Sequence, residues 1–132
     1  LEEVLWQADY VVVAVPGGAA TRGLIGEAQL RCLRPHAYLI NVGRGEVVDN
    51  AALTRGLQEG WFAGALVDTF AAEPLPPEHP LWTTPRMIVT PHVAALRTDP
   101  LGFGVPDQVV ENIRRFAAGE PLLNQVDLTL GY

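Results

Sequence analysis

Apolar residues along the chain form four short continuous runs, with helical patterns between and after them. The runs YVVVAV (10–15), AYLINV (37–42), FAGALVD (62–68) and MIVT (87–90) each predict a strand. The first run shows no alternation with polar residues, which is typical of a strand that is buried on both faces of a sheet.

Three further segments predict helices. Residues 26–34 carry apolar side chains at helical spacing and end before a proline. A short helix follows Asn50, which is a favourable N-cap residue, and Gly60 suits its left-handed end. Pro106 suits the first turn of a last helix, whose apolar face is closed by Gly119.

The order of these elements is strand, helix, strand, helix, strand, strand, with short connections. It predicts an α/β fold with right-handed crossovers and a parallel sheet. Parallel sheets bind ligands at the carboxyl ends of their strands. Candidate chemistry is therefore expected in the segments that directly follow the strands, which are 16–21, 43–45, 68–73 and 92–95.

The composition of the 132 residues fits one globular unit. Hydrophobic residues make up 48% and charged residues 18% of the chain, which is enough apolar material for a core. No apolar run reaches the roughly 18–20 residues that span a bilayer, so we expect a soluble, cytoplasmic protein without membrane partners. Cys32 is the single cysteine and cannot form an internal disulfide, and three widely spaced histidines predict no metal site.

The charges narrow the possible functions. All nine basic residues are arginines, against 15 acidic residues, for a net charge of −6. Without lysine the chain can form neither a Schiff base nor a P-loop phosphate site. A net negative chain with scattered arginines also lacks the basic surface that nucleic acid requires, so no nucleic-acid partner is expected. The dinucleotide-binding fingerprint G-x-G-x-x-G does not occur in the 132 residues.

Arg44 is the first candidate for chemistry. It stands between two glycines directly after the second predicted strand, in NVGRGEVVD, and glycines let a backbone turn tightly and approach a ligand closely. The planar guanidinium of an arginine can bind a carboxylate through two parallel hydrogen bonds. Taken alone, the pattern also fits a surface arginine in a turn.

His92, Glu73 and Asp68 complete the candidate set. His92 follows the fourth strand in TPHVAA, and a histidine is suited to proton transfer near neutral pH. Glu73 lies 19 residues earlier, and a carboxylate bonded to one ring nitrogen would favour the charged imidazole and orient the other nitrogen. Asp68 ends the third strand, where a carboxylate lies in the ligand crevice. The alternatives are a structural histidine, a solvated loop glutamate and an Asx turn or cap.

Four segments resemble, in this order, the D-2-hydroxyacid dehydrogenases: ADYVVVAVPGGAATRGLI, YLINVGRGEVVDNAAL, GALVDTFAAEPLPPEHPLW and TPHVAA. PLPPEHPLW and the final GY resemble the glyoxylate/hydroxypyruvate reductase branch. The resemblance implies that residues 1–96 are the second half of a Rossmann-type, doubly wound dinucleotide-binding domain. It also implies that residues 97–132 are a helix and tail that return to a substrate domain, so the chain would be the carboxyl-terminal portion of such an enzyme.

The resemblance implies catalytic roles for three of the candidates. Arg44 would bind the carboxylate and carbonyl oxygen of a small 2-oxo acid, His92 would protonate that oxygen as hydride arrives from the nicotinamide, and Glu73 would hydrogen-bond His92. Asp68 would contact the nicotinamide side of the cofactor. The expected cofactor-binding positions are Val15, Pro16, Thr21, Val42, Gly43, Arg44, Asp68, His92 and Ala94.

Further expectations follow from the same resemblance. The glycine-rich loop of the family would precede this chain, so either NAD or NADP is expected as cofactor and the isolated fragment is expected to be inactive. We expect a homodimer in the intact enzyme. Arg97 stands where much of the family has threonine, a departure that affects contacts near the nicotinamide. A non-catalytic binding or assembly module and an unrelated doubly wound domain are the alternatives.

Overall fold

The computed structural model describes residues 1–95 and 105–129. The chain divides into two compact units, Leu1–Ala94 and Ala95–Tyr132, and each is described by itself. All the predicted catalytic and cofactor-binding residues, from Val15 to Ala94, lie in the first unit. Arg97, the expected departure from the family pattern, lies outside the described residues.

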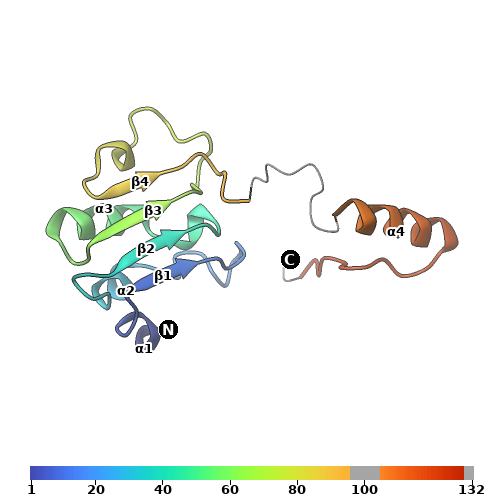
Figure 1. The fold of residues 1–132 in the computed structure, drawn as a ribbon, viewed down its shortest axis with the longest axis horizontal. Helices are drawn as coiled ribbons and strands as arrows, with labels where there is room; N and C mark the ends of the chain where they lie inside the picture. The colour runs from blue at the N-terminus through green and yellow to red at the C-terminus, as the bar shows by residue number, and fades with distance from the viewer. Residues whose placement is uncertain (96–104, 130–132) are drawn as a thin grey trace. The chain divides into compact units, whose positions relative to one another are not determined.

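The first unit is built on a four-stranded parallel sheet in the order β1-β2-β3-β4, and all its arrows point the same way (Figure 1). The strands are β1 (Tyr10–Val13), β2 (Tyr38–Asn41), β3 (Gly64–Val67) and β4 (Met87–Val89). Each lies within a segment that the apolar runs predicted, so the parallel α/β fold is confirmed. The register pairs the last residues of all four strands, namely Val13, Asn41, Val67 and Val89.

Short helices precede and connect the strands. They are α1 (Glu2–Leu5), α2 (Glu27–Arg31) and α3 (Asn50–Glu59), with the 3-10 helices η1 (Gly45–Val47) and η2 (Pro80–Thr83). The predicted cap of α3 is off by one residue. Asp49, not Asn50, is the N-cap, because its carboxylate accepts hydrogen bonds from the N–H groups of Ala51 and Ala52. Gly60 ends this helix with φ 77°, as predicted.

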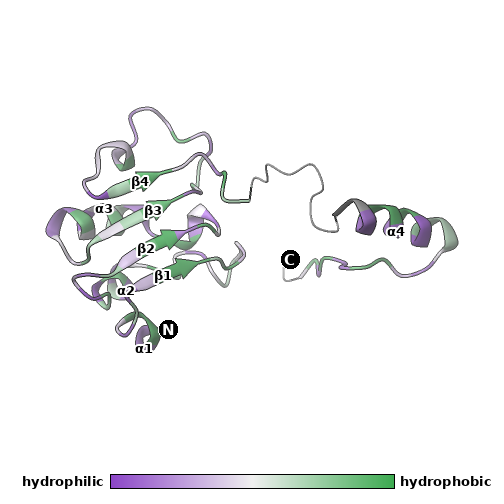
Figure 2. Ribbon diagram, in the orientation of Figure 1, coloured by the Kyte–Doolittle hydropathy of each residue, from purple (hydrophilic) through white to green (hydrophobic). Residues whose placement is uncertain are grey.

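The core lies between one face of the sheet and the helices. Leu30 of α2 and Leu53 and Leu57 of α3 are fully buried against strand residues such as Leu39 and Val67. Figure 2 shows hydrophobic residues along the strands and hydrophilic residues in the surrounding loops. Successive side chains of a strand point to opposite faces of the sheet, so every second strand residue points into this core.

The other face of the sheet is exposed in the described structure. Tyr10, Val12 and Ile88 are 69%, 59% and 59% exposed. The prediction that the first strand is buried on both faces is therefore wrong for this chain, because α2 and α3 both pack on the side of Val13 and Leu39. Tyr10 and Tyr38 stack on the exposed face with ring centroids 5.8 Å apart.

The second unit contains α4 (Val105–Ala118), which confirms the last predicted helix. Glu111 forms ion pairs with Arg114 and Arg115, each at 2.7 Å. The Asn112 side chain bonds both the N–H and the C=O of Leu123, which holds the tail against the helix. In the described parts of the chain, no helix combines the length and hydropathy required to cross a membrane.

Two buried threonines of the first unit offer a matched test of hydrogen bonding. Thr69 is 1% exposed and its hydroxyl has no partner among the described residues, whereas the hydroxyl of buried Thr84 donates to the C=O of Pro80 at 2.9 Å. An unsatisfied buried polar group costs stability. Urea denaturation should therefore show that Thr69→Val raises the free energy of unfolding by about 1 kcal/mol, whereas Thr84→Val lowers it by about 1 kcal/mol. Changes of the same sign in both variants would contradict this account.

Candidate functional site

The candidate residues gather at the carboxyl edge of the sheet. The ladder continues one residue past the strands, because the N–H groups of Val42, Asp68 and Thr90 donate to the C=O groups of Val13, Asn41 and Val67. The loops that follow the four strands therefore leave the sheet along one line. The predicted segments are brought together as the parallel order requires.

His92 and Glu73 form the central contact of this edge. The Nδ1 atom of His92 lies 2.8 Å from Oε2 of Glu73, across 19 residues of sequence. The other Glu73 oxygen accepts a hydrogen bond from the Phe70 N–H at 2.8 Å, which fixes the carboxylate from behind. This pairing is the one that the sequence suggested. Since Nδ1 is engaged, Nε2 is the ring nitrogen left for a reacting group.

The pair is open to solvent and electrostatically favourable. The side chains of His92 and Glu73 are 45% and 36% exposed, so a ligand can reach them. The hydrogen bond from His92 lowers the pKa of Glu73, and the Phe70 N–H and the positive charge of Arg44 lower it further. Glu73 is therefore anionic near neutral pH, so the Nδ1 atom of His92 faces a carboxylate that can accept its hydrogen bond.

Asp68 is only 2% exposed, and its oxygens are occupied by hydrogen bonds within the chain. It accepts hydrogen bonds from the Thr90 hydroxyl and from the N–H groups of Val93 and Ala94, the last two at 2.9 Å each. Burial raises the pKa of Asp68, but the hydrogen bonds outweigh burial and the net shift is downward. The hydrogen bonds of Asp68 join residues 22 to 26 positions apart, so they form neither the Asx turn nor the local cap that was the alternative. Contact of Asp68 with a cofactor stays a prediction.

Arg44 lies on the loop after β2, and its side chain is exposed. Its Nη1 donates to the C=O of Gly43 at 2.9 Å. Asn41, 1% exposed, shapes this loop by accepting from the Gly43 N–H at 3.1 Å and donating to the Arg44 C=O at 3.2 Å. Sequence reasoning missed Asn41, although a polar residue inside the apolar run AYLINV is a signal that could have found it.

The two glycines beside Arg44 serve contacts between loops. A Cβ on Gly45 would lie 2.0 Å from the carbonyl carbon of Phe70, and a Cβ on Gly43 would lie 2.8 Å from the oxygen of Val15. Neither position needs a positive φ. The backbone that carries Arg44 therefore packs directly against the loops after β1 and β3, which brings Arg44 to the loop that holds Glu73.

The loop after β1 holds the first predicted cofactor positions. Thr21 Oγ1 donates to the C=O of Pro16 at 2.7 Å, which closes this loop. The N–H of Gly23 donates to the C=O of Glu46, and Arg22 pairs with the Glu46 carboxylate at 2.8 Å. The loop is thus fastened to the Arg44 loop. Contact of Val15, Pro16, Thr21, Val42, Gly43 and Ala94 with a cofactor stays a prediction.

A cavity of about 280 Å³ lies beside the His92–Glu73 pair. Its lining is apolar apart from that pair and consists of Phe70, Pro74, Leu75, Trp82, Val89 and Pro91. The indole N–H of Trp82 donates to the C=O of Pro76 at 2.8 Å, so the ring is held in place. The pair therefore sits at the border between an apolar hollow and solvent.

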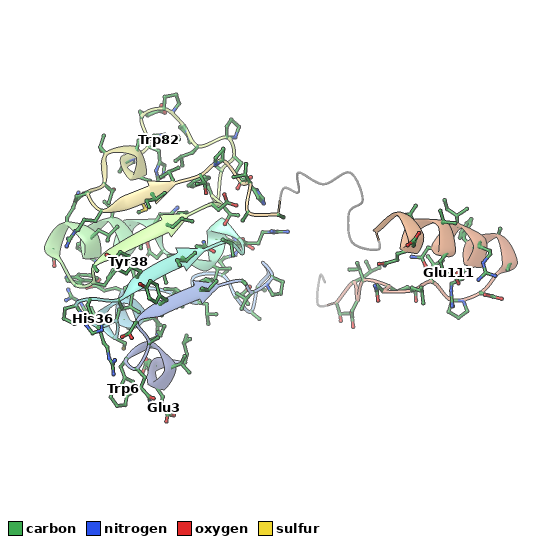
Figure 3. All side chains as sticks on the ribbon, viewed as in Figure 1. Glu3, Trp6, His36, Tyr38, Trp82 and Glu111 are labelled. Atoms are coloured by element: carbon green, nitrogen blue, oxygen red, sulfur yellow. The ribbon has the colours of Figure 1, made fainter. Side chains whose placement is uncertain are left out.

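The other two histidines make contacts outside the His92–Glu73 pair. His36 contacts Asp9 at 2.8 Å near the amino ends of the strands, where Figure 3 labels it. The Nδ1 atom of His79 accepts a hydrogen bond from the Leu81 N–H and caps η2. Within 1–95 and 105–129, no three His, Cys, Asp or Glu side chains are grouped so that they could hold a metal ion.

Comparison with known proteins gives the family. Residues 1–94 match the model of the D-isomer specific 2-hydroxyacid dehydrogenase NAD binding domain. The chain belongs to the D-isomer specific 2-hydroxyacid dehydrogenases. This confirms the resemblance and the Rossmann-type fold.

Several family members are similar over most of this chain. Glyoxylate/hydroxypyruvate reductase A of Photorhabdus laumondii is 38% identical over 132 residues, covering 100% of this chain and 41% of the relative. A D-isomer specific 2-hydroxyacid dehydrogenase of Xanthobacter autotrophicus, solved with NADPH and MES, is 46% identical with a TM-score of 0.89, over 100% of this chain and 53% of that one. The NADPH-dependent glyoxylate/hydroxypyruvate reductase of Sinorhizobium meliloti, solved with NADP and sulfate, is 34% identical with a TM-score of 0.85, over 99% and 42%.

The chain spans about two fifths of the length of the curated relative from Photorhabdus. The names of these relatives describe the activities of proteins that are longer than this chain. Activity, substrate and partners are therefore proposals for this chain.

The lowered pKa of Glu73 makes stability depend on pH. A carboxylate whose pKa is lower in the folded chain contributes stability above its unfolded pKa and loses it as pH falls through the folded pKa. Urea denaturation at successive pH values should therefore show a steeper loss of stability between about pH 5 and pH 3 in the wild type than in Glu73→Gln. Glu78→Gln, on the same loop, is the matched control and should keep the wild-type slope; equal slopes in all three proteins would refute the prediction.

Proposed function

We propose that this chain is part of an NAD- or NADP-dependent reductase that converts a small 2-oxo acid, of the glyoxylate or hydroxypyruvate type, into the D-2-hydroxy acid. The observation that carries the proposal is the 2.8 Å contact between His92 and Glu73 on the sheet edge that also presents Arg44. The names of the similar reductases support the substrate class.

The three side chains have complementary roles in this reaction. The Arg44 guanidinium binds the carboxylate of the 2-oxo acid through paired hydrogen bonds. The protonated imidazole of His92 donates its Nε2 proton to the carbonyl oxygen, which becomes the hydroxyl of the product. Glu73 holds the imidazole by Nδ1 and stabilises its charged form before the transfer.

A bound nicotinamide cofactor would supply the hydride that adds to the carbonyl carbon of the substrate. The residues at the carboxyl edge fit a nicotinamide. Val15, Pro16 and Val42 offer apolar surface at the ends of β1 and β2, Arg44 is exposed on the loop after β2, and His92 is exposed after β4. Parallel sheets bind dinucleotides at this edge. A homodimer and a cytoplasmic location, without nucleic-acid or membrane partners, remain predictions for the whole enzyme.

Replacement of His92 tests its role as the acid. In the whole protein that contains this chain, His92→Ala should lower kcat for glyoxylate or hydroxypyruvate by about 10²- to 10⁴-fold, the usual contribution of a general acid. His36→Ala removes a histidine at the opposite end of the strands and should leave kcat unchanged. Unchanged turnover in His92→Ala would favour a non-catalytic binding or assembly module.

Replacement of Arg44 separates binding from chemistry. Arg44→Lys keeps the charge but replaces the planar fork by a single ammonium group, so KM for the 2-oxo acid should rise while kcat changes less. Arg55→Lys on α3 is the matched control. A wild-type KM in Arg44→Lys would remove Arg44 from the substrate site and leave the role of His92 to be judged on its own result.

A further inference from the structure

The His92 turn is fastened by a carboxylate from another strand. Asp68 follows β3, and its hydrogen bonds flank His92 on both sides: the Thr90 hydroxyl precedes His92 by two residues, and the Val93 and Ala94 N–H groups follow it. One buried side chain thus joins the ends of β3 and β4.

This turn is one that needs support from its surroundings. His92 has φ 55°, in the left-handed region that a residue with a side chain rarely adopts. Within the turn the His92 N–H donates to the C=O of Thr90 at 3.1 Å, and the Thr90 N–H donates to the C=O of Val67 at 3.1 Å. Backbone hydrogen bonds therefore fix the start of the turn at Thr90. The Asp68 carboxylate fixes the backbone that follows His92, at Val93 and Ala94.

Thr90 supplies the one side-chain hydrogen bond that Asp68 accepts among the described residues. Its hydroxyl and the Val93 N–H donate to the same oxygen of Asp68, Oδ1, while the Ala94 N–H donates to Oδ2. The hydroxyl thus helps to orient the carboxylate toward the backbone beyond His92. Hydrogen bonds to an ionised acceptor are about twice as strong as neutral ones, so loss of this donor loosens the turn.

We propose that Thr90 is a positioning residue: through Asp68, its hydroxyl holds the turn that sets the His92 imidazole against Glu73. As a contribution to catalysis this rests on the proposed function, but the geometric claim stands without substrate or cofactor. Thr90 touches neither reacting group and acts through Asp68.

Glu73 reports on the position of the imidazole. The hydrogen bond from His92 is the main reason why the pKa of Glu73 is lowered, and the other groups that lower it are the Phe70 N–H and the charge of Arg44. If the His92 turn moves, Glu73 loses this hydrogen bond and its pKa rises. A change in overall stability alone would leave the pKa of Glu73 in the folded chain unchanged.

The test is a carbon-detected NMR titration of the Glu73 carboxyl in the 132-residue chain. Thr90→Val keeps the branched shape and removes the hydroxyl, so the pKa of Glu73 should rise toward the ordinary value of a glutamate. Thr90→Ser restores a hydroxyl and should keep the wild-type pKa. Thr83→Val is the matched control, because Thr83 donates to Pro80 on η2 and not to Asp68.

A wild-type Glu73 titration in folded Thr90→Val would overturn the proposal. Amide hydrogen exchange of the wild-type chain provides a second measurement that needs no variant. Slow exchange is expected at Val93 and Ala94 because Asp68 accepts both N–H groups. Fast exchange at both positions would also overturn it. Neither result depends on turnover, so the proposed reductase activity is judged separately by His92→Ala.

Discussion

The parallel register of four strands is the constraint on which the site depends. Val13, Asn41, Val67 and Val89 are paired across the sheet as the last residues of their strands, and the ladder extends one residue further. Loops that are far apart in sequence therefore begin side by side. The hydrogen bond between His92 and Glu73 is possible only because β3 and β4 end at the same level.

Contacts between the loops then convert this common edge into a defined geometry. Gly45 allows the Arg44 loop to press against Phe70, and the N–H of Phe70 holds the Glu73 carboxylate that meets His92. Asp68 fastens the other side of His92 through Val93 and Ala94. The exposed candidate side chains His92 and Glu73 are thus held by hydrogen bonds to less exposed groups around them, so they keep their orientation while they remain open to solvent.

Much of the fold could be predicted because its signals are local. Apolar runs marked the four strands, and Gly60 marked the end of α3. The N-cap of α3 was misplaced by one residue because Asp49 and Asn50 are both favourable caps, and only the backbone conformation distinguishes them. The one-sided burial of β1 could not be read from an apolar run, since side-chain type does not state which layers are present to cover a face.

The sequence by itself determined the parallel α/β class, and it proposed the strand ends and the candidates Arg44, Glu73 and His92, because residue type and order are enough for these. Only the tertiary structure decided how the candidates are held. The partners of Asp68 lie 22 to 26 residues away, and Asn41 and Gly45 act on neighbouring loops. Such contacts depend on strand register and loop packing, which no local pattern encodes.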